Sequence, residues 1–183
     1  MRIRIAFACL VTVAAAAPLV SQEKSRPYAG DEKREIKALS PEEIESYRSG
    51  AGMGFAKAAE LNHYPGPKHV LELAKEIGLV PAQEKQVQRT YDAMHAQTVG
   101  LGARLVVAER NLDGLFAATT IDGASLARSV REIARLQGEI RLEHLKAHLA
   151  VRSLLTPAQV AKYDALRGYG SGAVEHDPAR HGH

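Results

Sequence analysis

Two histidines, His144 and His148, lie four residues apart in a segment rich in Ala, Leu and Glu. On a helix this spacing places both imidazoles on adjacent turns of one side, where they could share one metal ion. His144 also falls between Ile140 and Ala147 in an apolar stripe, where a polar ring without a partner would be costly. The pair is therefore the first candidate for chemistry.

Two long segments would position this pair. From Pro81 to about Phe116, and again from about Gly123 to Leu155, apolar residues recur in alternating steps of four and three, which is a heptad seam. Residues 117–122 between them offer turn and cap chemistry, so we predict an antiparallel hairpin. The two stripes are Val87, Tyr91, Met94, Thr98, Leu101, Leu105, Ala108, Leu112 and Leu115, and Leu126, Val130, Ile133, Gln137, Ile140, His144, Ala147, Val151 and Leu154.

The hairpin register suggests further ligands. With a turn centred near residue 120, His144 faces residue 96 and His148 faces residue 92. His95 and Met94 then complete a site with His144 and His148, with Asp92 or Glu143 in reserve, and such ligands suit Zn, Cu, Ni or Co. The alternative is that His144 hydrogen-bonds Gln137, Thr98 or a backbone group and only fixes the register.

Two other groups of histidines are secondary candidates. His63 and His69 bracket a Pro-Gly turn, and Glu72 lies one helical turn after His69, so these residues either chelate or are solvated at a helix start. The C-terminal residues His176, His181 and His183 either bind metal loosely or belong to a plain disordered end.

The N-terminus has the pattern of a secretory leader. Basic residues in Met1–Arg4 precede an apolar stretch to Val20, and Ala16 or Ser21 offers a cleavage site. We predict a signal peptide over residues 1–21, with an uncleaved anchor as the alternative. Cleavage removes Cys9, the single cysteine, so the mature chain has neither disulfides nor thiolate metal sites.

Charge and motifs exclude several classes of function. Without the leader the chain has 22 basic and 21 acidic residues, and no basic patch with interleaved aromatics, so we expect no nucleic-acid partner. No nucleophile elbow, P-loop, dinucleotide fingerprint or H-E-x-x-H is present. We therefore expect no enzyme, and after cleavage no membrane span.

One short phrase recurs at three helix starts, at residues 39–43, 79–83 and 155–159. Ser40 with Glu43, and Thr156 with Gln159, can form capping boxes, whereas Val80 in the second copy has no capping oxygen. The motif residues of the second and third copies are Leu79, Pro81, Gln83, Leu155, Thr156, Pro157 and Gln159.

The remaining chain divides into an arm, one helical domain and a tail. We predict a mobile arm at 22–38, a helical domain at 39–167 and a flexible tail at 168–183. Within the domain we expect a helix from Pro41 to about Leu61 broken at the glycines of 49–54, a turn at 62–67, a short helix stopped by Gly78, and a last helix from Pro157 to about Arg167. The fold class is all-α.

The leader, the helical patterning and the L-T-x-x-Q-type starts together resemble the Spy/CpxP family of periplasmic stress proteins and their metal-sensing and metal-resistance relatives, over residues 40–167. The resemblance implies a periplasmic, ATP-independent chaperone for unfolded envelope proteins, or, alternatively, a sensor or resistance protein for Zn, Cu, Ni or Co. It also implies helical His pairs with added Met or Glu as ligands, no required cofactor, and unfolded periplasmic proteins or an envelope-stress signalling protein as partners.

The second long segment is apolar on two sides. Its second face carries Ala134, Gly138, Leu142, Leu145 and Leu149. A helix of this kind needs two partners. We expect the N-terminal helices or a second subunit to cover this face, which makes the protein a homodimer in the second case.

Overall fold

The structure is a computed structural model that describes residues 26–169, and every element within this range is a helix. The elements are η1 (Asp31–Lys33), α1 (Pro41–Arg48), α2 (Lys57–Glu60), α3 (Pro67–Glu72), α4 (Ala74–Ile77), α5 (Pro81–Ala117), α6 (Gly123–Leu154) and α7 (Pro157–Leu166). The all-α prediction and the limits of both long helices are confirmed.

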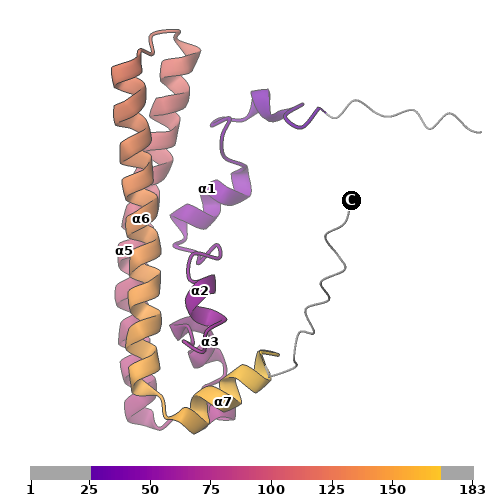
Figure 1. The fold of residues 1–183 in the computed structure, drawn as a ribbon, viewed down its shortest axis with the longest axis vertical. Coiled ribbons are helices and arrows are strands. Elements are labelled where there is room, and N and C mark those ends of the chain that lie inside the picture. Colours follow the sequence, from indigo (N-terminus) through magenta and orange to yellow (C-terminus); the bar gives the residue numbers. More distant parts are fainter. Residues whose placement is uncertain (1–25, 170–183) are drawn as a thin grey trace, which may run out of the picture.

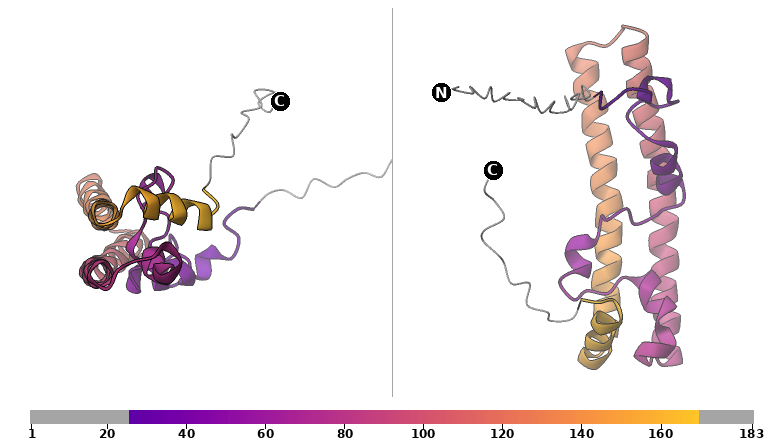
Figure 2. Two further views of the ribbon diagram at one scale, coloured as in Figure 1. Left: turned by 90° about the horizontal axis from the view of Figure 1, so that it is seen from below. Right: turned by 90° about the vertical axis from the view of Figure 1, so that its right-hand side faces the viewer.

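Helices α5 and α6 form the predicted antiparallel hairpin (Figure 1). The N-terminal segment descends along one side of it, from the closed tip towards the open end, and α7 crosses below that open end. Seen from below, the hairpin forms one layer and the N-terminal elements form a second (Figure 2). At the tip, Asp122 caps α6, because its Oδ1 accepts a 2.6 Å hydrogen bond from the Ser125 amide.

The predicted seam is confirmed along α5, where every position of the stripe is buried or half-buried. On α6 the stripe is buried or half-buried only from Ile133 onward, while Leu126 and Val130 are exposed. Their assignment to the seam was wrong because the N-terminal segment packs on the α5 side at the tip, through Lys37 and Asp113, and leaves the α6 side open. Leu136 and His148, which the stripe omits, are buried instead.

The apolar core is divided into two clusters, one towards the tip and one at the open end. The first contains Ile36, Leu39, Ile44, Tyr47, Leu105, Val106, Ile133, Leu136 and Ile140, and the second contains Val70, Ile77, Val87, Val151, Leu155, Val160 and Tyr163. Between them α5 and α6 present Met94, Thr98, His144 and His148, all buried. The polar middle of the hairpin therefore separates two hydrophobic ends.

The predicted mobile arm differs from the structure in its described part, because Ile36 is fully buried in the first cluster. Glu35 also pairs with Arg110 at 2.6 Å, and Lys37 pairs with Asp113 at 3.1 Å. One isoleucine in a polar stretch produces no periodicity, so the sequence pattern does not reveal this anchor.

The segment from α1 to α4 lies close against the hairpin. Ser40 and Glu43 form the predicted capping box of α1. Helix α1 then approaches α5 so closely that a Cβ built on Gly102 would lie 2.0 Å from the Tyr47 carbonyl oxygen. The predicted break at the glycines of 49–54 is confirmed. The single short helix expected after the turn is two helices, α3 and α4, because the backbone of Leu73 leaves the helical conformation at φ −105° and ψ 14°.

The two motif glutamines meet where the hairpin opens. Each side-chain oxygen accepts from the amide of its own N-cap residue, Val80 for Gln83 and Thr156 for Gln159. Their amide groups exchange hydrogen bonds at 3.0 and 2.9 Å, and they also donate to the carbonyls of Leu154 and Gly78. The recurring phrase thus builds a clasp between α5 and α7, which we call the glutamine clasp.

Some predictions fall outside the described residues. These are the leader over residues 1–21, the start of the arm, and the tail with His176, His181 and His183. Among the helices of residues 26–169, none combines the length and the apolar character that a membrane crossing requires.

Candidate metal centre

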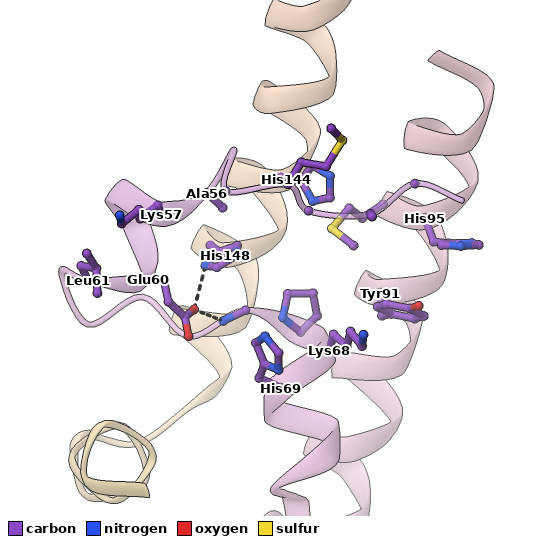
Figure 3. A pocket seen from close by; sticks show the side chains of 18 of the residues that line it. Ala56, Lys57, Glu60, Leu61, Lys68, His69, Tyr91, His95, His144 and His148 are labelled. Carbon is purple, nitrogen blue, oxygen red and sulfur yellow. Dashed lines mark hydrogen bonds and ion pairs between the residues drawn. The ribbon is translucent and has the colours of Figure 1, made fainter. Parts of the chain in front are cut away.

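A cavity of about 640 Å³ lies at the polar middle of the molecule. Its walls are the glycine-rich loop at 49–54, the turn before α3, and the facing surfaces of α5 and α6 (Figure 3). The side chains on its walls include the possible ligands Met53, Glu60, His69, Tyr91, Met94, His95, His144 and His148. The cavity brings together the predicted primary site and one of the secondary candidates.

His144 is the most informative of these residues. Its side chain is 4% exposed and its ring stacks on Phe55, with 6.2 Å between ring centroids. The Ala51 backbone lies next to the ring. Its Nε2 is buried and has no hydrogen-bond partner within the described residues. The neutral ring carries a proton on one nitrogen and a lone pair on the other, and only the second can bind a metal ion.

Burial lowers the pKa of the His144 imidazole below its usual range. The neighbouring His148 adds to this effect, and the Ala51 carbonyl opposes it in part. The ring is therefore neutral at pH 7, which is the form that binds a metal ion.

His148 is held in one tautomer. Its Nδ1 donates a 2.7 Å hydrogen bond to the Tyr64 carbonyl, so Nε2 holds the lone pair. Gly66 lies against that edge of the ring, because a Cβ built on it would be 2.8 Å from Nε2. Metal-binding histidines are commonly oriented in this way, with the second ring nitrogen donating to a carbonyl or carboxylate.

Glu60 supports this arrangement and is the only acid among the described residues that line the cavity. Its Oε2 accepts from the Gly66 amide at 3.1 Å and lies 3.7 Å from His148 Nδ1 (Figure 3). Its Oε1 accepts from Tyr163, whose pKa is raised by burial and by this carboxylate, and lies 3.6 Å from Arg167. The carboxylate is thus engaged in fixing the turn that carries the Tyr64 carbonyl.

The other predicted ligands lie at the edges of the cavity or elsewhere. His95 stacks on Tyr91, with 5.6 Å between ring centroids, and its ring points away from His144 (Figure 3). His69 lines the cavity, and its Nδ1 lies 2.8 Å from Glu72 Oε2, a bond that lowers the pKa of Glu72. The reserve carboxylates Asp92 and Glu143 pair instead with Gln88 and Lys146.

His63 is separate from the cavity. Its Nδ1 lies 2.7 Å from Oδ2 of the buried Asp164, a contact that ties the turn before α3 to α7. Within residues 26–169, no three side chains of the types His, Cys, Asp and Glu are grouped so that they could hold one metal ion. The described structure therefore offers a histidine pair with neighbouring methionines rather than an assembled set of three or four nitrogen and oxygen ligands.

Comparison with known families covers this part of the chain. A family model described as heavy-metal resistance matches residues 46–162, which is more than half of the sequence. The chain belongs to the heavy-metal resistance family. Because this family contains the Spy/CpxP-like proteins, the resemblance inferred from the helix starts is confirmed. No curated protein and no solved structure matches the chain.

The region shared with the heavy-metal resistance family contains most of the lining of the cavity, including residues that sequence reasoning missed. Phe55 and the Tyr64 carbonyl orient the two imidazoles, and Met53 adds a sulfur to the wall. A carbonyl has no sequence signature, since every residue has one. The only available indication was the glycine spacing of the loop, which marks a place where backbone approaches another element.

Proposed function

We propose that this protein binds a heavy-metal ion in the cavity, through Nε2 of His144 and His148. The observation that carries the proposal is the buried, unpartnered Nε2 of His144, beside a second imidazole whose Nδ1 is already occupied. Leaving a buried acceptor without a partner costs about 1–3 kcal/mol. A ligand that accepts the lone pair would remove this cost, and a metal ion does so without requiring a proton.

Family membership supports a role in resistance to heavy metals, either by buffering the ion or by sensing it. The ion is the cargo or signal of such a protein, so no permanent cofactor is required. We assign no enzymatic activity, because no catalytic motif is present in the sequence. The leader pattern at the N-terminus and the family together support a periplasmic location.

Calorimetric titration of the chain with Zn, Cu, Ni and Co tests this assignment. His176, His181 and His183 are first replaced by alanine, so that binding by the C-terminal histidines does not mask the cavity. In that background, His144→Gln with His148→Gln should weaken binding at least about tenfold, because glutamine offers no imidazole nitrogen. The matched control is His63→Gln, a histidine outside the cavity, which should leave the affinity unchanged.

Circular dichroism keeps the result interpretable, since it reports whether each variant is folded. Unchanged affinity in a folded His144→Gln/His148→Gln protein would exclude the cavity as the binding site. Lost affinity in the His63→Gln control would show that the effect is structural rather than local.

A second candidate function is that of an ATP-independent chaperone, and a different surface favours it. On the second face of α6, Leu142 is 48% exposed and Leu149 is 59% exposed. The N-terminal helices do not cover Leu142 and Leu149, so this face has no partner within the described residues of the single chain. Exposed apolar surface of this kind binds a second copy or an unfolded client.

An aggregation assay with a chemically denatured client tests the chaperone. Light scattering should fall in the presence of the wild-type protein and recover with Leu142→Ser/Leu149→Ser, because the apolar surface is removed. Failure of the wild type to suppress aggregation at a several-fold molar excess would remove this function and leave metal binding unaffected.

A further inference from the structure

The cavity is much larger than a metal ion requires. Its volume is about 640 Å³, whereas one water molecule takes about 30 Å³ of the liquid. Clefts of about 300–1,000 Å³ are the usual size of sites for small organic ligands. An ion on His144 and His148 would therefore leave most of the cavity free for a second molecule.

The histidine pair also leaves such an ion short of ligands. Zinc, for example, takes three or four protein ligands. Within residues 26–169, no third side chain of the types His, Cys, Asp and Glu is grouped with the pair. Glu60, the only acid among the described residues of the wall, already accepts hydrogen bonds from the Gly66 amide and the Tyr163 hydroxyl. The missing ligands must then come from a molecule that enters the cavity.

The charges on the wall indicate the class of this molecule. Three cationic side chains line the cavity, Lys57, Lys68 and Arg167, against the single carboxylate of Glu60. Lys68 is 67% exposed, and its Nζ lies 4.0 Å from Glu72, so its charge is only weakly paired. A cleft whose walls carry an excess of one charge concentrates ligands of the opposite charge. The second molecule is therefore an anion.

The cations and the histidine pair lie on different walls. Lys68 belongs to α3 and lies across the cavity from His144 of α6 (Figure 3). Arg167 follows α7, where its Nε lies 3.6 Å from Glu60. An anion that meets both the ion and these cations needs at least two acidic groups at separate positions. A carboxylate suits both ends, because it ligates metal ions and forms charge-assisted hydrogen bonds with Lys and Arg.

We propose that the cavity binds the metal ion together with a small di- or tricarboxylate. One carboxylate completes the coordination of the ion on His144 and His148, and another pairs with Lys68 and Arg167. The inference rests on the proposed function, since it requires an ion on the same two imidazoles. It names the cargo of the protein as a metal chelate rather than a bare ion.

Equilibrium dialysis with Co²⁺ and radiolabelled citrate tests this inference. The full chain carries Cys9→Ser and alanine in place of the three C-terminal histidines, so that neither the thiol nor those imidazoles bind cobalt. Citrate retained per bound cobalt is the measured quantity, and the parent protein should retain about one. Lys68→Gln/Arg167→Gln should lower this ratio at least about threefold, because two charge-assisted contacts are lost.

The matched control is Lys85→Gln/Arg89→Gln, which removes the same charges from an exposed face of α5 outside the cavity lining. It should keep the ratio of the parent. Because Arg167 also contacts Glu60, Lys68→Gln alone is measured as a second variant, in which only an exposed side chain changes. This variant should lower the ratio at least about twofold.

The visible absorption of Co²⁺ provides an independent measurement, since it responds to the ligands of the ion. Adding citrate to the cobalt-loaded parent should change this spectrum while the cobalt stays with the protein. In a folded His144→Gln/His148→Gln protein, neither cobalt nor citrate should be retained in this way.

The outcomes separate the two proposals. If labelled citrate strips the cobalt or stays in solution, the chelate assignment is overturned while metal binding by the histidine pair stands. Retention that needs no cobalt, or that is equal in the parent and in both cavity variants, would also overturn it. If cobalt binding in citrate-free buffer does not depend on His144 and His148, and no other metal depends on them, the proposed function itself fails.

Discussion

The orientation of each imidazole depends on residues that are distant in sequence. The Tyr64 carbonyl fixes the tautomer of His148 and Phe55 stacks on the ring of His144, and both residues belong to the N-terminal segment rather than to the hairpin. The hairpin alone would present two rings free to rotate. The site is therefore assembled only when the N-terminal layer is in place.

The lowered pKa of His144 makes the metal-free protein sensitive to acid. An imidazole whose folded pKa lies below its ordinary value of about 6.5 contributes stability above that value, and this contribution is lost as the pH falls through the folded pKa. We expect thermal stability in the presence of a chelator to decline from pH 7 to pH 5 more steeply in the wild type than in His144→Gln.

Scanning calorimetry over this pH range measures the difference. His95→Gln is the matched control, because it replaces a histidine of the same cavity that is only half-buried, whereas His144 is buried. It should keep the pH dependence of the wild type. Parallel profiles for the wild type and His144→Gln would contradict the assignment of this acid sensitivity to the buried ring.

Two glycines of α5 provide a test of how closely α1 approaches. A methyl group on Gly102 would overlap the Tyr47 carbonyl, whereas one on Gly100 would meet nothing within 4 Å. Gly102→Ala should destabilise the protein by about 1–3 kcal/mol, as expected for overpacking. Gly100→Ala should stabilise it by about 0.5–1 kcal/mol through helix propensity.

Urea unfolding, followed by circular dichroism, gives both free energies under the same conditions. Gly100→Ala is the control for the intrinsic preference of the helix for alanine. Equal stabilisation by the two substitutions would mean that α1 does not contact α5 at this point.

At the scale of elements, the glutamine clasp explains why one phrase opens two helices that are far apart in sequence. Each glutamine caps its own helix with its oxygen and reaches the other helix with its amide nitrogen. Gln83 also satisfies the carbonyl of Leu154, the last residue of α6. The capping half of this arrangement is predictable from spacing, but the pairing requires the hairpin to return α6 to the start of α5.

Removing one member of the clasp should weaken the open end of the molecule. Gln83→Leu keeps the approximate shape and deletes both the donor to Leu154 and the partner of Gln159. We expect a loss of about 1–3 kcal/mol in the free energy of unfolding, since polar groups remain without partners. The control is Gln88→Leu, which removes only a surface hydrogen bond to Asp92 and should change stability by about 0.5 kcal/mol or less.

Chemical denaturation with urea again provides the measurement. A loss in Gln83→Leu no larger than that in Gln88→Leu would contradict the clasp. A similar loss in Gln159→Leu would support it, because the two side chains share the same hydrogen bonds.

The elements differ in how much of them could be predicted. The long helices were found because a seven-residue repeat sustained over nine positions leaves little choice of structure. The exposure of Leu126 and Val130 was not predicted, because burial at the tip depends on which side of the hairpin the N-terminal segment covers. The contact of Ile36 and the break at Leu73 likewise depend on tertiary packing rather than on local pattern.

For the whole molecule, the division of the core has a functional meaning. Two apolar clusters hold the ends of the hairpin, so the middle can contain a cavity and polar rings without loss of the fold. The histidine pair was predictable because spacing alone places it on one face of a helix. The position of Met53 on the cavity wall was not predictable, since it depends on the path of a glycine-rich loop that has no periodicity.

The second face of α6 leads to a prediction about assembly. Leu142 and Leu149 are seven residues apart and both are exposed, and the same side carries Ala134 and Gly138, which would allow another helix to approach closely. We expect the protein to be a dimer at micromolar concentration, with this face at the interface. Leu142→Gln/Leu149→Gln should then convert it to a monomer without changing its helix content.

Sedimentation velocity distinguishes the two states by mass, and circular dichroism checks the fold. The matched control is Leu126→Gln/Val130→Gln, which replaces two exposed apolar side chains at the tip and should leave the dimer intact. A polar substitution weakens an apolar interface only where the substituted side chain is buried in that interface. If the control variant dissociates and Leu142→Gln/Leu149→Gln does not, the dimer contact lies at the tip of the hairpin. A wild type that sediments as a monomer would leave this face free for an unfolded client, and the aggregation assay would then decide its role.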